Sequence, residues 1–198
     1  MQRTVTNQMI IFDDRYIEKD EVVDLHNNVS SRKNWSQDPS NNLISYIPVE
    51  VNNENLSDDA KFFIRKLDLF ANANRIDINE VKEITLIKMD QKIDKQELEY
   101  ESPEIDEEEG NILLFISTND SDGHTYVFNE GLSEAKTIND LTVFTLFSPY
   151  AGRGFIVFPD KFYALSMPEK FENQYMVKIK FAGKIIQNQA STVYDMEM

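Results

Sequence analysis

The pattern of apolar and polar residues divides the chain into a mixed first half and a strand-rich second half. Helical spacing of apolar residues predicts a helix over residues 19–29 and a second helix that begins after Ser57, its expected N-cap. Short apolar runs predict strands at residues 9–12 and 43–51. Further runs predict strands over residues 81–89, 112–116, 126–128, 141–147, 155–158 and 175–181.

Turn residues separate the strands of the second half. All six glycines lie at or after Gly110, and pairs such as Asp122-Gly123 and Ala182-Gly183 stand between apolar runs. Short strands at this spacing predict a sandwich or barrel. We expect one domain over residues 1–198, made of three parts. These parts are a helix-containing segment (1–80), a β core (81–182) and a C-terminal arm or edge strand (183–198).

Composition narrows the classes of function. The chain is 41% hydrophobic and 11% aromatic, which indicates a folded protein, and its net charge is −15. Such acidity repels nucleic acids and anionic membranes, so we expect neither as a partner. It permits a basic protein partner but does not require one. The chain has no cysteine for a disulfide, and its first residues lack the apolar run of a signal peptide. We therefore expect intracellular synthesis.

Acidic residues crowd residues 97–109, a pattern open to two interpretations. It fits a cation site or a dock for a basic partner, but runs of charge are more often solvated loops, which we favour. Residues 119–123 resemble part of a calcium loop. However, Thr118 and Asn129 would then occupy the first and last ligand positions, and neither is a carboxylate. A β-turn is the better interpretation.

Histidine and glycine patterns give little support for catalysis. His26 and His124 are the only histidines and lie far apart in sequence, so a structural role is favoured over metal ligation for each. A G-x-S-x-G nucleophile elbow is absent. The glycine pair at residues 152–154 is too short for a phosphate-binding loop, and a predicted strand follows it.

One segment carries a family resemblance. Residues 148–159, Ser-Pro-Tyr-Ala-Gly-Arg-Gly-Phe-Ile-Val-Phe-Pro, resemble the P-x-x-G-R-x-x-x-F-P segment of the 2-oxoglutarate- and iron-dependent oxygenases, especially the prolyl-hydroxylase-like group. Residues 113–117 with 122–125, residues 174–177, and the opening residues 9–17 are similar to other parts of that family. The resemblance implies a mainly β fold with α (α+β). Specifically, it implies a double-stranded β-helix, or jelly roll, with N-terminal helices packed on one sheet.

Departures from the family pattern fall at its functional positions. The family's register places Ala164 at the distal iron-binding histidine, or Tyr163 if the register slips by one residue, and Gln174 at the arginine that holds 2-oxoglutarate. The family's His-x-Asp pair should fall within residues 97–106, which contain no histidine. His124 falls at a glutamate that is not an iron ligand. The resemblance thus implies a pseudoenzyme with no cofactor.

Three functions follow from this interpretation. The favoured one is a non-catalytic jelly-roll protein that acts through protein–protein contacts in an oligomer or larger assembly. We expect it to be a structural component of a phage or viral particle, with the virion as its location. Its former active-site mouth would be filled by side chains such as Tyr163 and Tyr175.

A third class of function is a carbohydrate- or small-ligand-binding jelly roll, which would show a ligand-induced rise in melting temperature.

The alternative is a divergent hydroxylase that uses Fe(II) and 2-oxoglutarate through a non-standard metal site. Its possible ligands are carboxylates near the strand-rich core together with one histidine, namely Glu101, Asp106, Asp122 and His124.

Overall fold

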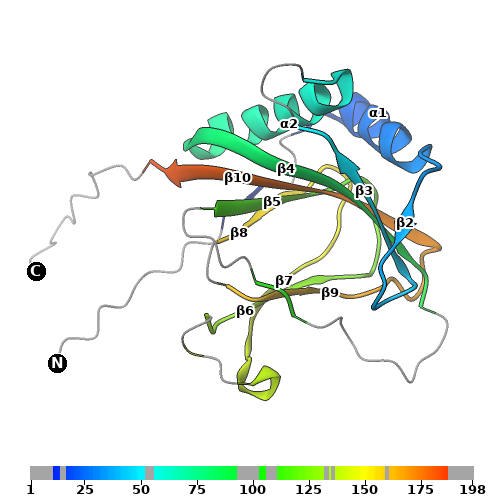
Figure 1. The fold of residues 1–198 in the computed structure, drawn as a ribbon, viewed down its shortest axis with the longest axis vertical. Coiled ribbons are helices and arrows are strands. Elements are labelled where there is room, and N and C mark those ends of the chain that lie inside the picture. Colours follow the sequence, from blue (N-terminus) through cyan, green and yellow to red (C-terminus); the bar gives the residue numbers. More distant parts are fainter. Residues whose placement is uncertain are drawn as a thin grey trace, which may run out of the picture.

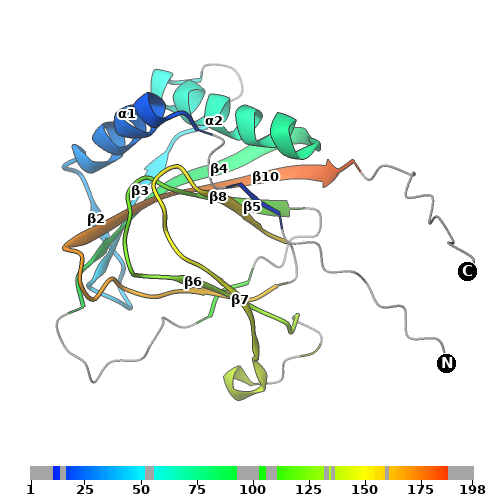
Figure 2. The same ribbon diagram turned by 180° about the vertical axis from the view of Figure 1, so that it is seen from behind.

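Two antiparallel sheets face each other across a shared interior, and two helices cover the outer face of the larger sheet (Figures 1 and 2). The structure is a computed structural model that describes residues 11–13, 17–51, 56–92, 103–105, 111–131, 134, 137–158 and 161–186. This arrangement is a double-stranded β-helix in a mainly β fold with helices, so the predicted fold class is confirmed.

The large sheet contains seven strands. In spatial order they are β1 (Phe12–Asp13), β8 (Gly154–Val157), β5 (Asn111–Ser117), β10 (Asn173–Ile185), β4 (Ile76–Asp90), β3 (Ile44–Val49) and β2 (Ser36–Gln37). β10 occupies the centre and pairs with both β4 and β5.

The small sheet contains three strands. In spatial order they are β7 (Val143–Phe147), β6 (Thr125–Phe128) and β9 (Tyr163–Leu165). A short 3-10 helix, η1 (Ile138–Asp140), precedes β7. Beyond β9, Glu104 forms an antiparallel bridge with Tyr163, which extends the sheet by one short extended segment.

Both predicted helices are confirmed. α1 spans Lys19–Ser30 and α2 spans Asp58–Asn74. The Ser57 hydroxyl accepts a hydrogen bond from the Ala60 N–H at 3.1 Å, and acidic residues occupy the first turn of α2. These groups satisfy an unpaired N–H and complement the positive end of the helix dipole.

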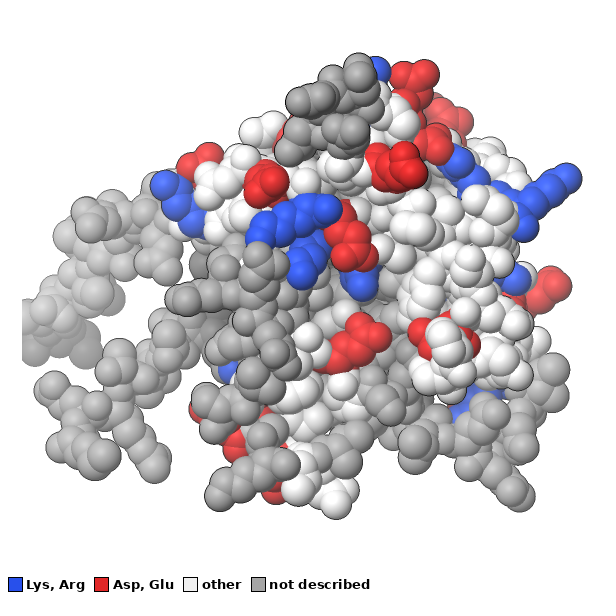
Figure 3. All heavy atoms as spheres, viewed as in Figure 1, with Lys and Arg blue, Asp and Glu red and all other residues white. Residues whose placement is uncertain are grey.

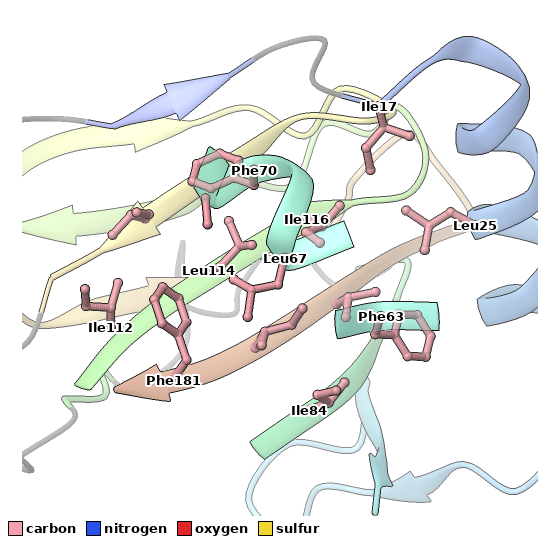
Figure 4. Close-up of a cluster of buried hydrophobic side chains, with 14 of the residues drawn as sticks. Ile17, Leu25, Phe63, Leu67, Phe70, Ile84, Ile112, Leu114, Ile116 and Phe181 are labelled. Carbon is pink, nitrogen blue, oxygen red and sulfur yellow. The ribbon is translucent and has the colours of Figure 1, made fainter. Parts of the chain in front are cut away.

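The apolar stripe of α2 packs on the outer face of the large sheet (Figure 4). Phe63, Leu67 and Phe70 recur at helical spacing and are fully buried, against β5 residues such as Leu114 and Ile116. Burial of each such side chain contributes roughly 1.5–3 kcal/mol. This outer core holds the helices on the sheet.

Side-chain alternation along β10 decides which residues reach the interior. Val177, Ile179 and Phe181 point toward the helices and belong to the outer core. Met176 points the other way, into the space between the sheets, and Gln174 lies two residues before it on the same face. The two faces of one strand thus serve the two cores.

Several strand bounds differ from the prediction. β9 was not predicted, since it is three residues long and has no apolar alternation of its own. β4 begins at Ile76 rather than at residue 81. The apolar pattern did not predict its first residues, because several of them are polar and face solvent. β10 continues to Ile185 at the centre of the large sheet, past the predicted end of the core, and residues 187–198 of the predicted arm lie outside the described residues. β1 overlaps the first predicted strand at Phe12, and residues 9 and 10 also lie outside the described part.

Charged side chains of both signs share the surface. On the face drawn in Figure 3, a central group of basic side chains lies beside acidic ones. Two ion pairs illustrate this mixing: Lys88 contacts Asp90 at 2.7 Å, and Arg32 contacts Asp59 at 2.6 Å. Among the described residues, no helix has the length and apolar character needed to cross a membrane.

Candidate functional site

The interior between the two sheets is the natural candidate for a functional site, because both sheets contribute side chains to it. The buried residues here form one apolar cluster, which is distinct from the outer core under the helices. Its members are Ile44, Ile87, Met89, Leu113, Phe115, Val127, Phe147, Phe155, Val157, Tyr163, Leu165, Met167 and Met176.

Aromatic rings fill the middle of this interior. Phe147 of the small sheet stacks on Phe155 of the large sheet, with ring centroids 4.2 Å apart and planes 9° from parallel. Phe155 in turn stacks on Phe115 at 5.3 Å, and Tyr163 meets Phe115 edge-on at 5.3 Å. Aromatic contacts of this kind add roughly 0.5–1.5 kcal/mol per pair beyond the area they bury. The two sheets are therefore joined by packed rings.

Tyr163 is the polar end of this aromatic series. Its phenol hydroxyl donates a hydrogen bond to the Glu104 carboxylate, and the two backbones exchange N–H···O bonds at 2.7 and 2.9 Å. Tyr163 is buried, whereas Glu104 is exposed, so the pair lies where the interior meets solvent. Sequence reasoning placed Glu104 only within the acidic run, because its pairing with β9 depends on tertiary structure.

Ala164 points away from the interior. It packs with Tyr126 and Phe128 in a separate cluster on the outer face of the small sheet. Its strand neighbours Tyr163 and Leu165 belong to the interior cluster, as period-two alternation requires. Ala164 therefore lies on the opposite face of β9 from the interior, whereas Tyr163, the alternative position in the family register, lies inside.

Gln174 lies inside, in a neutral and incompletely bonded environment. Its Nε2 contacts the Met176 sulfur at 3.4 Å, and its buried Oε1 has no hydrogen-bond partner among the described residues. A Cβ added at Gly123 would lie 2.4 Å from that Oε1, so this glycine allows the close approach.

Two more buried oxygens share the end of the interior where Gln174 lies. The hydroxyls of Ser117, opposite Met176 on β5, and of Thr125, at the start of β6, have no partner among the described residues. Sequence reasoning missed both residues. The alternation of β5 could have indicated Ser117, which shares a face with Leu113 and Phe115.

Both histidines lie outside the interior. His26, on α1, approaches the Thr118 hydroxyl through Nδ1 at 3.2 Å, and its ring meets Tyr175 edge-on on the outer face of the large sheet. His124 has its ring against Tyr126, which belongs to the outer face of the small sheet. Its backbone N–H donates to the Ser166 hydroxyl at 2.7 Å, and its buried Nδ1 has no partner among the described residues.

Tyr175 does not fill the mouth of the roll, so that prediction is wrong. It alternates with the inward residues of β10 and lies on the outer face, where its ring also contacts Trp35 at 5.9 Å. Burial raises the pKa of its phenol there.

Of the carboxylates proposed for the alternative metal site, Asp122 is the one that the structure describes. Asp122 accepts hydrogen bonds from the backbone N–H groups of Glu169 and Lys170, each at 3.1 Å, so it holds a turn. Glu101 and Asp106 lie outside the described residues. Within the described ranges, no three His, Cys, Asp or Glu side chains are grouped so as to hold a metal ion.

The fold can now be compared with known proteins. No protein-family model matches the sequence, and no curated protein matches it. Among solved structures, the non-heme alpha-ketoglutarate-dependent epimerase SnoN from nogalamycin biosynthesis superposes with a TM-score of 0.63 at 7% identity, over 92% of this chain and 82% of that chain. A Pseudomonas putida prolyl-4-hydroxylase gives a TM-score of 0.58 at 8% identity, over 87% of this chain and 91% of that chain.

The protein HygX from Streptomyces hygroscopicus, whose structure has nickel and 2-oxoglutarate bound, gives a TM-score of 0.57 at 9% identity, over 87% of this chain and 82% of that chain. The chain has the fold of the 2-oxoglutarate- and iron-dependent oxygenases. The resemblance inferred from residues 148–159 is therefore supported at the level of the fold. At sequence identities of 7–9%, the shared fold does not indicate the activity of this chain.

The residues that line the interior do not fit the iron centre expected of an oxygenase fold. Such a centre needs two histidines and a carboxylate, but both histidines of the chain lie outside the roll. Gln174 carries no charge, so it cannot form the charge-assisted pair by which an arginine holds a carboxylate. The described interior is instead apolar and aromatic, with three unpartnered oxygens at one end.

Proposed function

We propose that the chain is a non-catalytic protein on the oxygenase fold that acts through protein–protein contacts. The observation that carries the proposal is the interior itself. Stacked rings of Phe115, Phe147 and Phe155 join the two sheets where a reacting group would need space. The fold survives such filling because core packing holds it, whereas activity depends on a small set of polar groups.

We further propose that the contacts serve a phage or viral particle, in which the chain is a structural component. Jelly rolls are common in such particles, and a rigid roll with a packed interior suits a structural role. Mass spectrometry of purified particles from the source of the sequence tests this part. Recovery of the chain in a fixed ratio to a shell protein would support it, and recovery only from the soluble fraction would contradict it.

A divergent oxygenase is the second candidate, because the solved structures that share the fold include alpha-ketoglutarate-dependent enzymes. A metal site would then use His124, whose buried Nδ1 has no partner among the described residues, with carboxylates of the acidic run.

Metal and cosubstrate assays separate the two candidates. Purified protein is loaded anaerobically with Fe(II) and 2-oxoglutarate, and bound iron and melting temperature are measured. Oxygen, the co-reactant that oxidative decarboxylation of 2-oxoglutarate requires, is then admitted and succinate is measured. We expect no stoichiometric iron, no succinate and no shift in melting temperature, because the interior has no suitable ligands.

Two histidine variants make the test specific. Stoichiometric iron that is lost in His124→Ala and kept in His26→Ala would overturn the main proposal, and succinate formed with the same dependence would establish the alternative. Iron bound equally by both variants and the parent, without succinate, would be attributed to the acidic surface and would leave the non-catalytic proposal standing.

A further inference from the structure

The outer face of the small sheet is more apolar than is usual for a sheet face that points away from the interior. A sheet that buries one face usually presents polar side chains on the other. Here the outward side chains include Tyr126, Phe128 and Ala164 as a buried cluster. Beside them, Val143, Phe144 and Leu146 of β7 are 46%, 37% and 48% exposed. We call these last three residues the β7 patch.

Strand register places the β7 patch on that outer face. Leu146 is opposite Tyr126, and Val143 is opposite Phe128. The register shifts between Val127 and Phe128, so Phe144 is the additional residue of a β-bulge beside Val143. In a bulge, two residues of one strand oppose a single residue of the other. The three exposed side chains therefore extend the apolar cluster to the sheet edge.

β7 is also an edge strand. In the described part of the chain, β6 pairs with one side of β7 and no strand pairs with the other. Exposed apolar edges favour unwanted association, and proteins usually protect them with charge or cover them. A contiguous apolar patch on such an edge is typical of an interaction surface.

The rim of the patch is acidic. Glu130 accepts two hydrogen bonds from Thr142, the residue before Val143, and these bonds lower the pKa of its carboxyl, so it stays ionised at neutral pH. Glu134 and Asp140 follow in the same β6–β7 connection. Lys161 donates a hydrogen bond to the Asn129 carbonyl in this region. The one basic residue of the connection, Lys136, lies outside the described residues, and the acidic residues there outnumber it.

We infer that the β7 patch is the docking surface for a basic protein partner, which inserts apolar side chains flanked by lysine or arginine. Charge complementarity favours this occupant over a second copy of the chain, because two chains of net charge −15 repel each other. The inference rests on the proposed function and names the chemistry of its partner.

A peptide probe tests this chemistry. A short synthetic peptide of alternating lysine and leucine is titrated into isotope-labelled protein, and amide shifts are followed by NMR. We expect saturable binding that perturbs residues 141–147 and is at least about tenfold weaker in the Phe144→Ser, Leu146→Ser double variant. The control is Val23→Ser, which removes an apolar side chain of similar exposure (52%) from α1 and should leave the affinity unchanged. Circular dichroism verifies that each variant is folded.

Three outcomes would overturn the inference. One is binding that the double variant leaves unchanged. Another is equal binding of a glutamate–leucine peptide, which would show that binding does not depend on opposite charges of the protein and its partner. The third is sedimentation of the parent protein as a dimer that the double variant makes monomeric, which would assign the patch to a second copy. None of these outcomes concerns iron binding or succinate formation, so failure of the docking inference can be distinguished from failure of the proposed function.

Discussion

Arg32 and Asp59 form a two-point contact that joins the end of α1 to the start of α2. Their side chains meet at 2.6 Å (Nη1 to Oδ2) and 2.8 Å (Nη2 to Oδ1). The hydrogen bonds from Arg32 lower the pKa of the Asp59 carboxyl, and Asp59 raises the pKa of the guanidinium. Since both groups are partly exposed, solvent screening limits the contribution of the pair to about 0.5–1 kcal/mol.

Asp59→Asn should lower the free energy of unfolding by about 0.5–1 kcal/mol at neutral pH. Because the folded pKa of Asp59 is depressed, its contribution is present above the unfolded pKa and is lost as pH falls through the folded value. The difference from the parent should therefore shrink in acid. Urea unfolding at neutral and acidic pH measures both effects. Asp58→Asn is the control, since its fully exposed carboxylate meets Lys61 only at 3.4 Å; an equal loss there would contradict the assignment.

At the scale of elements, one turn fixes how β8 enters the large sheet beneath α1. Gly152 has φ of 85°, in the left-handed region, and its N–H donates to the Ser117 carbonyl at 2.8 Å. A Cβ at this position would lie 2.7 Å from Val22 Cγ2 of α1. Both the backbone angle and the neighbouring helix therefore require glycine.

Gly152→Ala should lower the free energy of unfolding by about 1–3 kcal/mol, because it adds backbone strain and a clash with α1. Thermal or urea unfolding measures the loss. The Val22→Ala background removes the clash but keeps the strain, so the same substitution should cost less there. An identical cost in both backgrounds would show that only the backbone angle matters.

Sequence patterns were sufficient for elements with local periodicity and insufficient for those defined by pairing. The α2 stripe of Phe63, Leu67 and Phe70 and the Ser57 cap are local signals, and both were predicted correctly. β9 has no such signal, because its position follows from pairing with β6. For the same reason the sequence did not show which face of the sheet Ala164 belongs to, because a shift of one residue exchanges the two faces of a strand. Gln174 faces the interior, and the missing hydrogen bond of its Oε1 depends on tertiary contacts that the sequence does not show.

At the scale of the whole molecule, the large sheet separates two cores. The helices close the outer core around Phe70, and the small sheet closes the interior around Phe155. If the interior is structural, as we propose, its rings should stabilise the fold as strongly as those under the helices.

Phe155→Ala and Phe70→Ala should each lower the free energy of unfolding by about 3–5 kcal/mol, because each leaves a cavity in a packed core. Equilibrium denaturation measures both. Phe171→Ala is the control, since that ring is 43% exposed and its loss should change stability by less than about 0.5 kcal/mol. A small effect at Phe155 alone would indicate a loosely packed interior and would favour a ligand-binding role.

The place of β10 has a consequence for how the protein is made. Among the described strands it is the last to leave the ribosome, yet it lies between β4 and β5 at the centre of the large sheet. Until it emerges, β4 and β5 have no common neighbour, and both expose backbone groups that can pair with other chains. The nascent protein therefore carries one edge of β4 and one edge of β5 unprotected until β10 emerges, and chaperone occupancy should persist until residues 173–185 have been released.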